Sequence, residues 1–137
     1  MQQGIIEKNH MDILWHDYAL NKEDTIPITK AGLIEKASVV GRCGMMLLSC
    51  GTGAWRVRSS MNTLSRELGI TCTADIGLMS IEYTCFDGEN CFSQSLCLTN
   101  TGVNTSKLNR LENFINDFPT KEKYLSGEQI HSYLDEI

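Results

Sequence analysis

The sequence predicts an α+β fold made of a helical hairpin, a small antiparallel sheet of two to three strands, and two further helices. Apolar residues recur every three or four positions over residues 30–69 and alternate with polar ones from about residue 76 to residue 98. The helical spacing returns after residue 104. Because helices and strands fall in separate blocks, the order favours α+β over the alternating α/β class.

The first predicted helix begins after Thr29, whose side chain suits an N-cap. Gly41 and Gly44 weaken an isolated helix by ~1 kcal/mol each relative to alanine, but their small size lets another helix approach closely. The residues that share one apolar face are Leu33, Ala37, Val40, Gly44, Leu47 and Leu48.

A glycine turn joins this helix to a second one, which runs from Ala54 to about Leu68. Gly51 and Gly53 supply the backbone freedom that a tight turn needs. Gly69 then suits the residue that ends a helix. The apolar face of the second helix contains Val57, Met61, Leu64 and Leu68.

The strands follow the hairpin. Ile76 and Leu78 are expected on one side of a first strand. The turn Asp87-Gly88-Glu89-Asn90 then indicates a β-hairpin. The alternating apolar positions on the two sides of that turn are Met79, Ile81, Tyr83 and Cys85, and then Phe92, Leu96 and Leu98.

Two helices close the chain. One is expected from Asn104 to Asp117, before Pro119. The other begins near Ser126, which forms a capping-box pattern with Gln129. Its pattern reaches residue 137 without a C-cap, so we expect the polypeptide to continue beyond that residue.

Residues 1–29 are predicted to be an N-terminal segment and linker, and residues 30–137 a soluble domain. A short helix near Ile13 and Tyr18 fits the pattern, and the charged stretch around Pro27 is typical of a linker. Two His/Asp pairs and one further histidine raise the question of a metal site, but a solvated segment and a surface histidine explain them better. These residues are His10, Asp12, His16, Asp17 and His131. We expect no metal and no cofactor.

Charge and composition exclude several classes of function. Asp and Glu number 17 against 12 Lys and Arg, which gives a net charge of −5. A nucleic-acid partner is not expected, because phosphate binding requires a clustered basic surplus. A membrane span requires ~20 mostly apolar residues in a row, and the sequence has no such run.

The six cysteines are expected to be reduced, mostly buried small hydrophobes. Cys85 and Cys91 flank the predicted β-turn, so they are candidates to face each other across two strands. No catalytic constellation of side chains is recognisable, and the chain is therefore expected not to be an enzyme.

Arg56 is unusual because it lies in the first turn of a predicted helix. A helix N-terminus carries partial positive charge, which disfavours a cation there by ~0.3–1 kcal/mol. A salt bridge, stacking on Trp55, a carbonyl cluster or an anionic ligand would each offset this cost. We therefore name Arg56, with Gly51 of the preceding turn, as candidate substrate-binding residues.

The stretch that contains these residues resembles the threonine/serine exporter family. The resemblance covers roughly residues 30–137 and also includes Gly102-Val103-Asn104 and the stretch from Leu125 to Ile137. Its most specific part is the leucine-rich helix, then Cys50-Gly51, Trp55-Arg56-Val57 and Leu68-Gly69. Where the family usually carries a carboxylate after Arg-Val, this chain has Arg58, which removes the nearest partner for Arg56.

The resemblance implies a cytoplasmic domain of a bacterial inner-membrane secondary exporter of small amino acids or organic acids. It implies a gating, assembly or sensing role, with a membrane-spanning region or partner subunit and a small-molecule substrate as partners. Two alternatives stay open: a stand-alone hydrolase that uses a cysteine such as Cys50, and a dimerisation module that forms a homo-oligomer.

Overall fold

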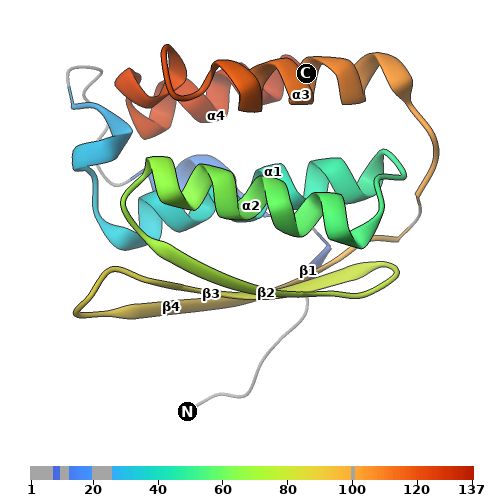
Figure 1. Ribbon diagram of the computed structural model, residues 1–137, viewed down its shortest axis with the longest axis horizontal. Helices are drawn as coiled ribbons and strands as arrows, with labels where there is room; N and C mark the ends of the chain where they lie inside the picture. The colour runs from blue at the N-terminus through green and yellow to red at the C-terminus, as the bar shows by residue number, and fades with distance from the viewer. Residues whose placement is uncertain (1–7, 10–12, 20–25, 100) are drawn as a thin grey trace.

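The computed structural model describes residues 8–9, 13–19, 26–99 and 101–137, which form three layers (Figure 1). A sheet forms one layer, α1 and α2 form the middle one, and α3 and α4 lie on the far side of the helical pair. The elements are β1 (Lys8–Asn9), η2 (Trp15–Tyr18), η3 (Ile28–Lys30), α1 (Leu33–Ser49), α2 (Ala54–Glu67), β2 (Thr71–Ile76), β3 (Ser80–Phe86), β4 (Cys91–Cys97), α3 (Thr105–Asp117), η4 (Glu122–Tyr124) and α4 (Gly127–Asp135).

The predicted helical hairpin is confirmed as α1 and α2, which pack against each other. Gly51 has a φ of 88° in the turn between them, and Gly69 has a φ of 75° after α2, so both need a glycine backbone. The predicted cap at Thr29 is wrong. Pro27 precedes a short 3-10 helix that contains Thr29. Helix α1 begins only after Gly32, which is its N-cap and has an extended backbone conformation.

Helix α1 is the centre of the molecule, because it contacts α2, β3, β4, α3, α4, η2 and η3. It is apolar almost all round, as expected for a helix that is covered on every side. Its two inner glycines serve two different neighbours. A Cβ at Gly41 would lie 2.3 Å from the Tyr83 hydroxyl of β3, whereas one at Gly44 would lie 2.6 Å from the Met61 sulfur of α2.

The sheet has the strand order β1-β4-β3-β2. Strands β2, β3 and β4 form the predicted antiparallel set, and β1 adds a short parallel strand at the β4 edge that the sequence did not reveal. Leu78 was predicted within a strand, but it follows the end of β2 and its side chain is 91% exposed.

The register also corrects the expected cysteine pair. Cys85 lies opposite Phe92, and Cys91 lies opposite Phe86. The offset of one residue places the two cysteines on opposite faces of the sheet, because side chains alternate along a strand. Cys72 of β2 is the residue opposite Cys85. All six cysteines are free, and four of them are buried.

Both C-terminal helices begin with a side-chain N-cap, and the one at Ser126 is the predicted capping box. The Asn104 side chain accepts a hydrogen bond from the Lys107 backbone N–H, and Ser126 and Gln129 form a capping box. Helix α4 ends at Asp135 with Glu136 as its C-cap, so the expectation that the helix reaches residue 137 is wrong.

Part of the N-terminal segment belongs to the same hydrophobic core as the helices. Trp15 and Ile28 are 6% and 0% exposed, and both contribute to the core cluster. Trp15 lies in η2, a single 3-10 turn where a short helix was expected. Within the described ranges, no helix combines the length and the apolar run that a bilayer crossing needs.

Candidate ligand pocket

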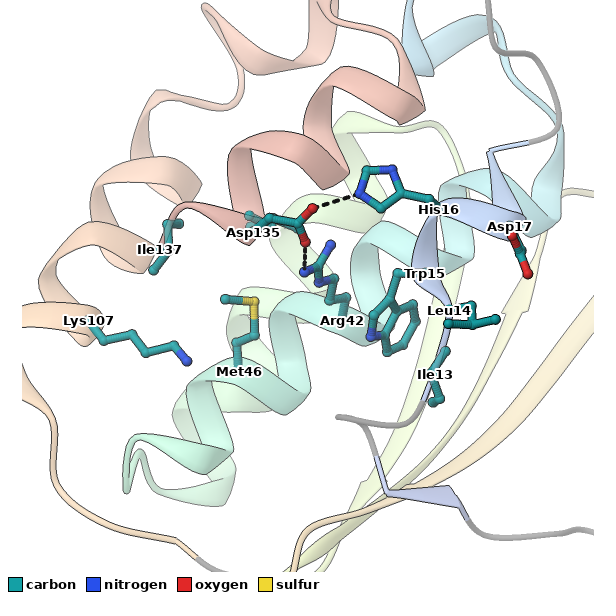
Figure 2. A pocket seen from close by; sticks show the side chains of 11 residues that line it. Ile13, Leu14, Trp15, His16, Asp17, Arg42, Met46, Lys107, Asp135 and Ile137 are labelled. Atoms are coloured by element: carbon teal, nitrogen blue, oxygen red, sulfur yellow. Dashed lines mark hydrogen bonds and ion pairs between the residues drawn. The ribbon is translucent and has the colours of Figure 1, made fainter.

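A pocket of about 490 Å³ opens where η2, α1, α3 and α4 meet (Figure 2). This volume lies in the usual range for small-molecule sites, ~300–1,000 Å³. Its lining combines apolar and charged side chains from four separate parts of the chain. They are Ile13, Leu14, Trp15, His16, Asp17, Arg42, Met46, Lys107, Leu134, Asp135 and Ile137.

Asp135 of α4 connects three elements at one side of the pocket. Its Oδ2 lies 2.7 Å from the His16 Nε2, and its Oδ1 accepts a hydrogen bond from the Arg42 guanidinium (Figure 2). The other ring nitrogen of His16, Nδ1, lies 3.0 Å from the Glu128 carboxylate. The hydrogen bond with Asp135 is the largest cause of the raised pKa of His16. Burial opposes it, and the hydrogen bond with Glu128 raises the pKa further. His16 is therefore held by two carboxylates, which the prediction of a solvated segment did not include, although its side chain is 34% exposed and Asp17 is exposed as predicted.

His131 lies behind this cluster and is 0% exposed, so the prediction of a surface histidine is wrong. An Arg42 Nη1–H donates to the His131 Nδ1 over 3.1 Å, and the Ser38 hydroxyl lies 2.9 Å from Nε2. Because a guanidinium can only donate, Nδ1 must accept and Nε2 must carry the proton. Ser38 in turn donates to the Glu35 carbonyl. Burial, followed by the charge of Arg42, lowers the pKa of His131 to about 3.

Lys107 forms the opposite side of the pocket. It comes from the first turn of α3, is half-buried, and extends its ammonium toward the space beside Met46 (Figure 2). Among the described residues, no carboxylate lies within ion-pair distance of Lys107. The pocket therefore offers an uncompensated cation next to an apolar wall.

The predicted pair Gly51 and Arg56 lies outside this pocket. Gly51 is exposed in the α1–α2 turn, where Val103 lies against it. Arg56 forms a salt bridge with Glu112 of α3, and its side chain is 62% exposed. The salt bridge is one of the compensations considered for this arginine, and it replaces the partner that is absent at position 58. Arg58 instead donates to the Ala74 carbonyl.

We expect Arg56→Met to change the free energy of unfolding by less than ~1 kcal/mol, because exposed ion pairs contribute little. Urea denaturation in low and high salt measures this, and Glu112→Gln is the matched variant on the partner side. In a double-mutant cycle the coupling energy between the two changes should be small, and it should decrease further in high salt. A loss of several kcal/mol would show that Arg56 has a structural role that the geometry does not reveal.

The hydrolase alternative finds little support in Cys50, the cysteine named for it. Cys50 is only 3% exposed, and burial raises the pKa of Cys43 to about 12. A nucleophilic cysteine needs a thiolate that substrate can reach. In the described part of the chain, no group of His, Cys, Asp and Glu has the arrangement of a metal site, and His10 and Asp12 lie outside that part.

Sequence reasoning missed the pocket because its charged residues are far apart in the chain. Arg42 lies within an apolar helix, Lys107 in the first turn of α3, and Asp135 near the end of α4. One signal was available: Arg42 lies among apolar residues from Val39 to Leu48, and such an arginine requires a polar partner. That signal indicates a buried polar cluster without telling which residues complete it.

The comparisons with known proteins give one match. The threonine/serine exporter (ThrE) family model matches residues 38–137, which is well over half of the chain. No curated protein and no solved structure gives a match. The match covers most of α1, all of α2, α3 and α4, and strands β2, β3 and β4 of the described sheet, together with Arg42, Lys107 and Asp135 of the pocket. The chain therefore belongs to the threonine/serine exporter family.

Proposed function

We propose that this chain is the cytoplasmic domain of an inner-membrane secondary exporter of small amino acids or organic acids. The observation that carries this proposal is the family match over residues 38–137. The motifs around Gly51 and Arg56 support the same assignment. The domain acts by gating, assembly or sensing, and its partner is a membrane-spanning region in the same polypeptide or in a second subunit.

Export can be tested in the native cell by deleting the coding sequence and loading the cells with a threonine-containing dipeptide. Intracellular hydrolysis of the dipeptide then produces a threonine excess. We expect slower threonine efflux and a higher internal threonine concentration than in the parent strain, with recovery when the intact gene is restored. Serine and succinate are followed in parallel. Unchanged efflux of all three compounds would contradict the proposal.

The membrane partner has its own test in the genome. We expect the reading frame beyond codon 137, or an adjacent gene, to encode several apolar stretches of ~20 residues. A stop codon together with the absence of any neighbouring membrane gene would contradict this arrangement. Light scattering of the purified chain determines whether it also forms a homo-oligomer.

A further inference from the structure

The pocket between η2, α1, α3 and α4 has the features of a binding site for one chemical class of ligand. We propose that it is a regulatory site for a small carboxylate-bearing molecule, whose carboxylate binds Lys107 and whose carbon body lies against Trp15 and Met46. The regulatory role, and the choice of cargo-like ligands, rest on the proposed export function. The binding itself rests on the pocket.

The charges in the pocket favour an anion over a cation. Both oxygens of Asp135 already have partners, one in Arg42 and one in His16, so this carboxylate is engaged within the protein. Asp17 also lines the pocket, but it belongs to η2 and lies at the opposite side from Lys107 (Figure 2). No carboxylate among the residues that the structure describes is paired with Lys107, whose ammonium extends toward the interior of the pocket. A ligand carboxylate would supply the counter-charge that this ammonium lacks.

The remaining lining suits a compact carbon body. Trp15 is 6% exposed, and its ring is stacked on His131 with centroids 6.2 Å apart, so the indole is held in one orientation. Met46 lies between Trp15 and Lys107 in Figure 2, and Leu134 adds apolar surface from α4. A methionine side chain adapts to different shapes at low cost. The wall therefore fits both short aliphatic acids and small amino acids, and in each case the ligand carboxylate would contact Lys107.

The ligand would also join segments that are distant in the sequence. Lys107 belongs to α3, Met46 to α1, and Trp15 to the N-terminal segment. A molecule that contacts all three stabilises their docking by an amount that grows with the logarithm of one plus the ratio of its concentration to the dissociation constant. This dependence is what a sensor of cargo concentration requires.

The two tryptophans permit a direct test on the 137-residue chain. Trp55 is 77% exposed and does not line the pocket, so Trp55→Phe leaves Trp15 as the single tryptophan reporter. L-threonine, L-serine and succinate are titrated separately while the Trp15 emission is recorded. The same titrations by calorimetry detect binding that leaves the emission unchanged. We expect at least one probe to saturate, with a dissociation constant on the order of 1 mM.

The charge contact is tested in the same background with Lys107→Met, which keeps most of the side-chain length and removes the ammonium. We expect the dissociation constant to rise about tenfold or more, as for loss of a hydrogen bond to a charged group. Lys121→Met is the matched control, because it removes an equal charge from an exposed site beyond the other end of α3. Its affinity should equal that of the parent.

Two results would overturn the inference: no saturable signal by either method with any probe, or equal affinities of the Lys107 and Lys121 variants. The outcome is separable from the export test. If deletion of the gene slows efflux but the purified chain binds none of the probes, only the proposed binding site is refuted. Binding at Lys107 in a chain whose deletion leaves efflux unchanged refutes the exporter role and leaves a carboxylate-binding protein.

Discussion

Replacing Gly41 with alanine should destabilise the chain by about 3 kcal/mol, as the sum of overpacking and a disturbed buried hydroxyl, less the gain in helix propensity. The added Cβ would lie 2.3 Å from the Tyr83 hydroxyl oxygen and 2.5 Å from the ring carbon that carries it. Tyr83 is 2% exposed, and its ring is too stiff to bend aside. The hydroxyl also lies within hydrogen-bond distance of the Ala37 carbonyl and the Gln94 side chain.

Gly44→Ala is the matched control on the same helix. Its Cβ would lie 2.6 Å from the Met61 sulfur, a similarly close approach, but a methionine side chain can rotate away. The gain in helix propensity then offsets the repacking, and the net change should stay within ~1 kcal/mol of zero. Urea denaturation of the two variants compares them directly. Equal losses would mean that the contact with Tyr83 is no more rigid than the contact with Met61.

Acidification from pH 7 to pH 5 should cost about 2 kcal/mol of unfolding free energy through His131 alone. The folded pKa of about 3 lies below the unfolded value of 6.5, so in this range only the unfolded state takes up the proton. The contribution therefore decreases as pH falls below 6.5, with a limiting slope of ~1.4 kcal/mol per pH unit. Protonation in the folded state would place an N–H against the Arg42 guanidinium that now donates to that nitrogen.

His16 has the opposite dependence. Its pKa is raised, chiefly by the hydrogen bond with Asp135, so its stabilising contribution is complete below 6.5 and is lost as pH rises through the folded pKa. The two histidines together predict a stability maximum near pH 6.5. His131→Asn, which keeps an acceptor for Arg42, should flatten the acid side of the profile, and His16→Gln should flatten the alkaline side. The measurement is urea denaturation at half-unit steps from pH 5 to pH 8. Wild-type and His131→Asn profiles that run parallel below pH 6.5 would contradict the buried neutral histidine.

The sequence predicted those parts of the fold that depend on neighbours along the chain. The hairpin, the β-turn at Asp87-Gly88-Glu89-Asn90 and the capping box at Ser126 follow from local periodicity and local hydrogen bonds, and each is present. Strand β1 is two residues long and pairs with β4 from the opposite part of the chain. Such a short strand has no recognisable periodicity and no turn links it to β4, so the sequence alone could not predict the β1–β4 pairing.

The candidate site was predictable only in part for the same reason. Arg56 attracted notice because of its position in a helix, and its partner Glu112 is on another helix. The burial of His131 depends on Trp15 and Arg42, which reach it from two other segments. The local sequence around a histidine on a terminal helix does not indicate whether its side chain is buried or exposed to solvent. Three-dimensional contact, rather than residue type, determines its chemistry.

The central position of α1 has a consequence for how the molecule unfolds. The sheet and the α3–α4 layer do not each possess a separate core, since both pack against the α1–α2 layer, and α1 contacts strands on one side and both C-terminal helices on the other. Loosening either layer exposes apolar surface of α1 and weakens the other, so we expect a single cooperative transition. Amide hydrogens in the middle of α1 should then exchange with solvent at rates set by global unfolding, slower than those of any outer helix.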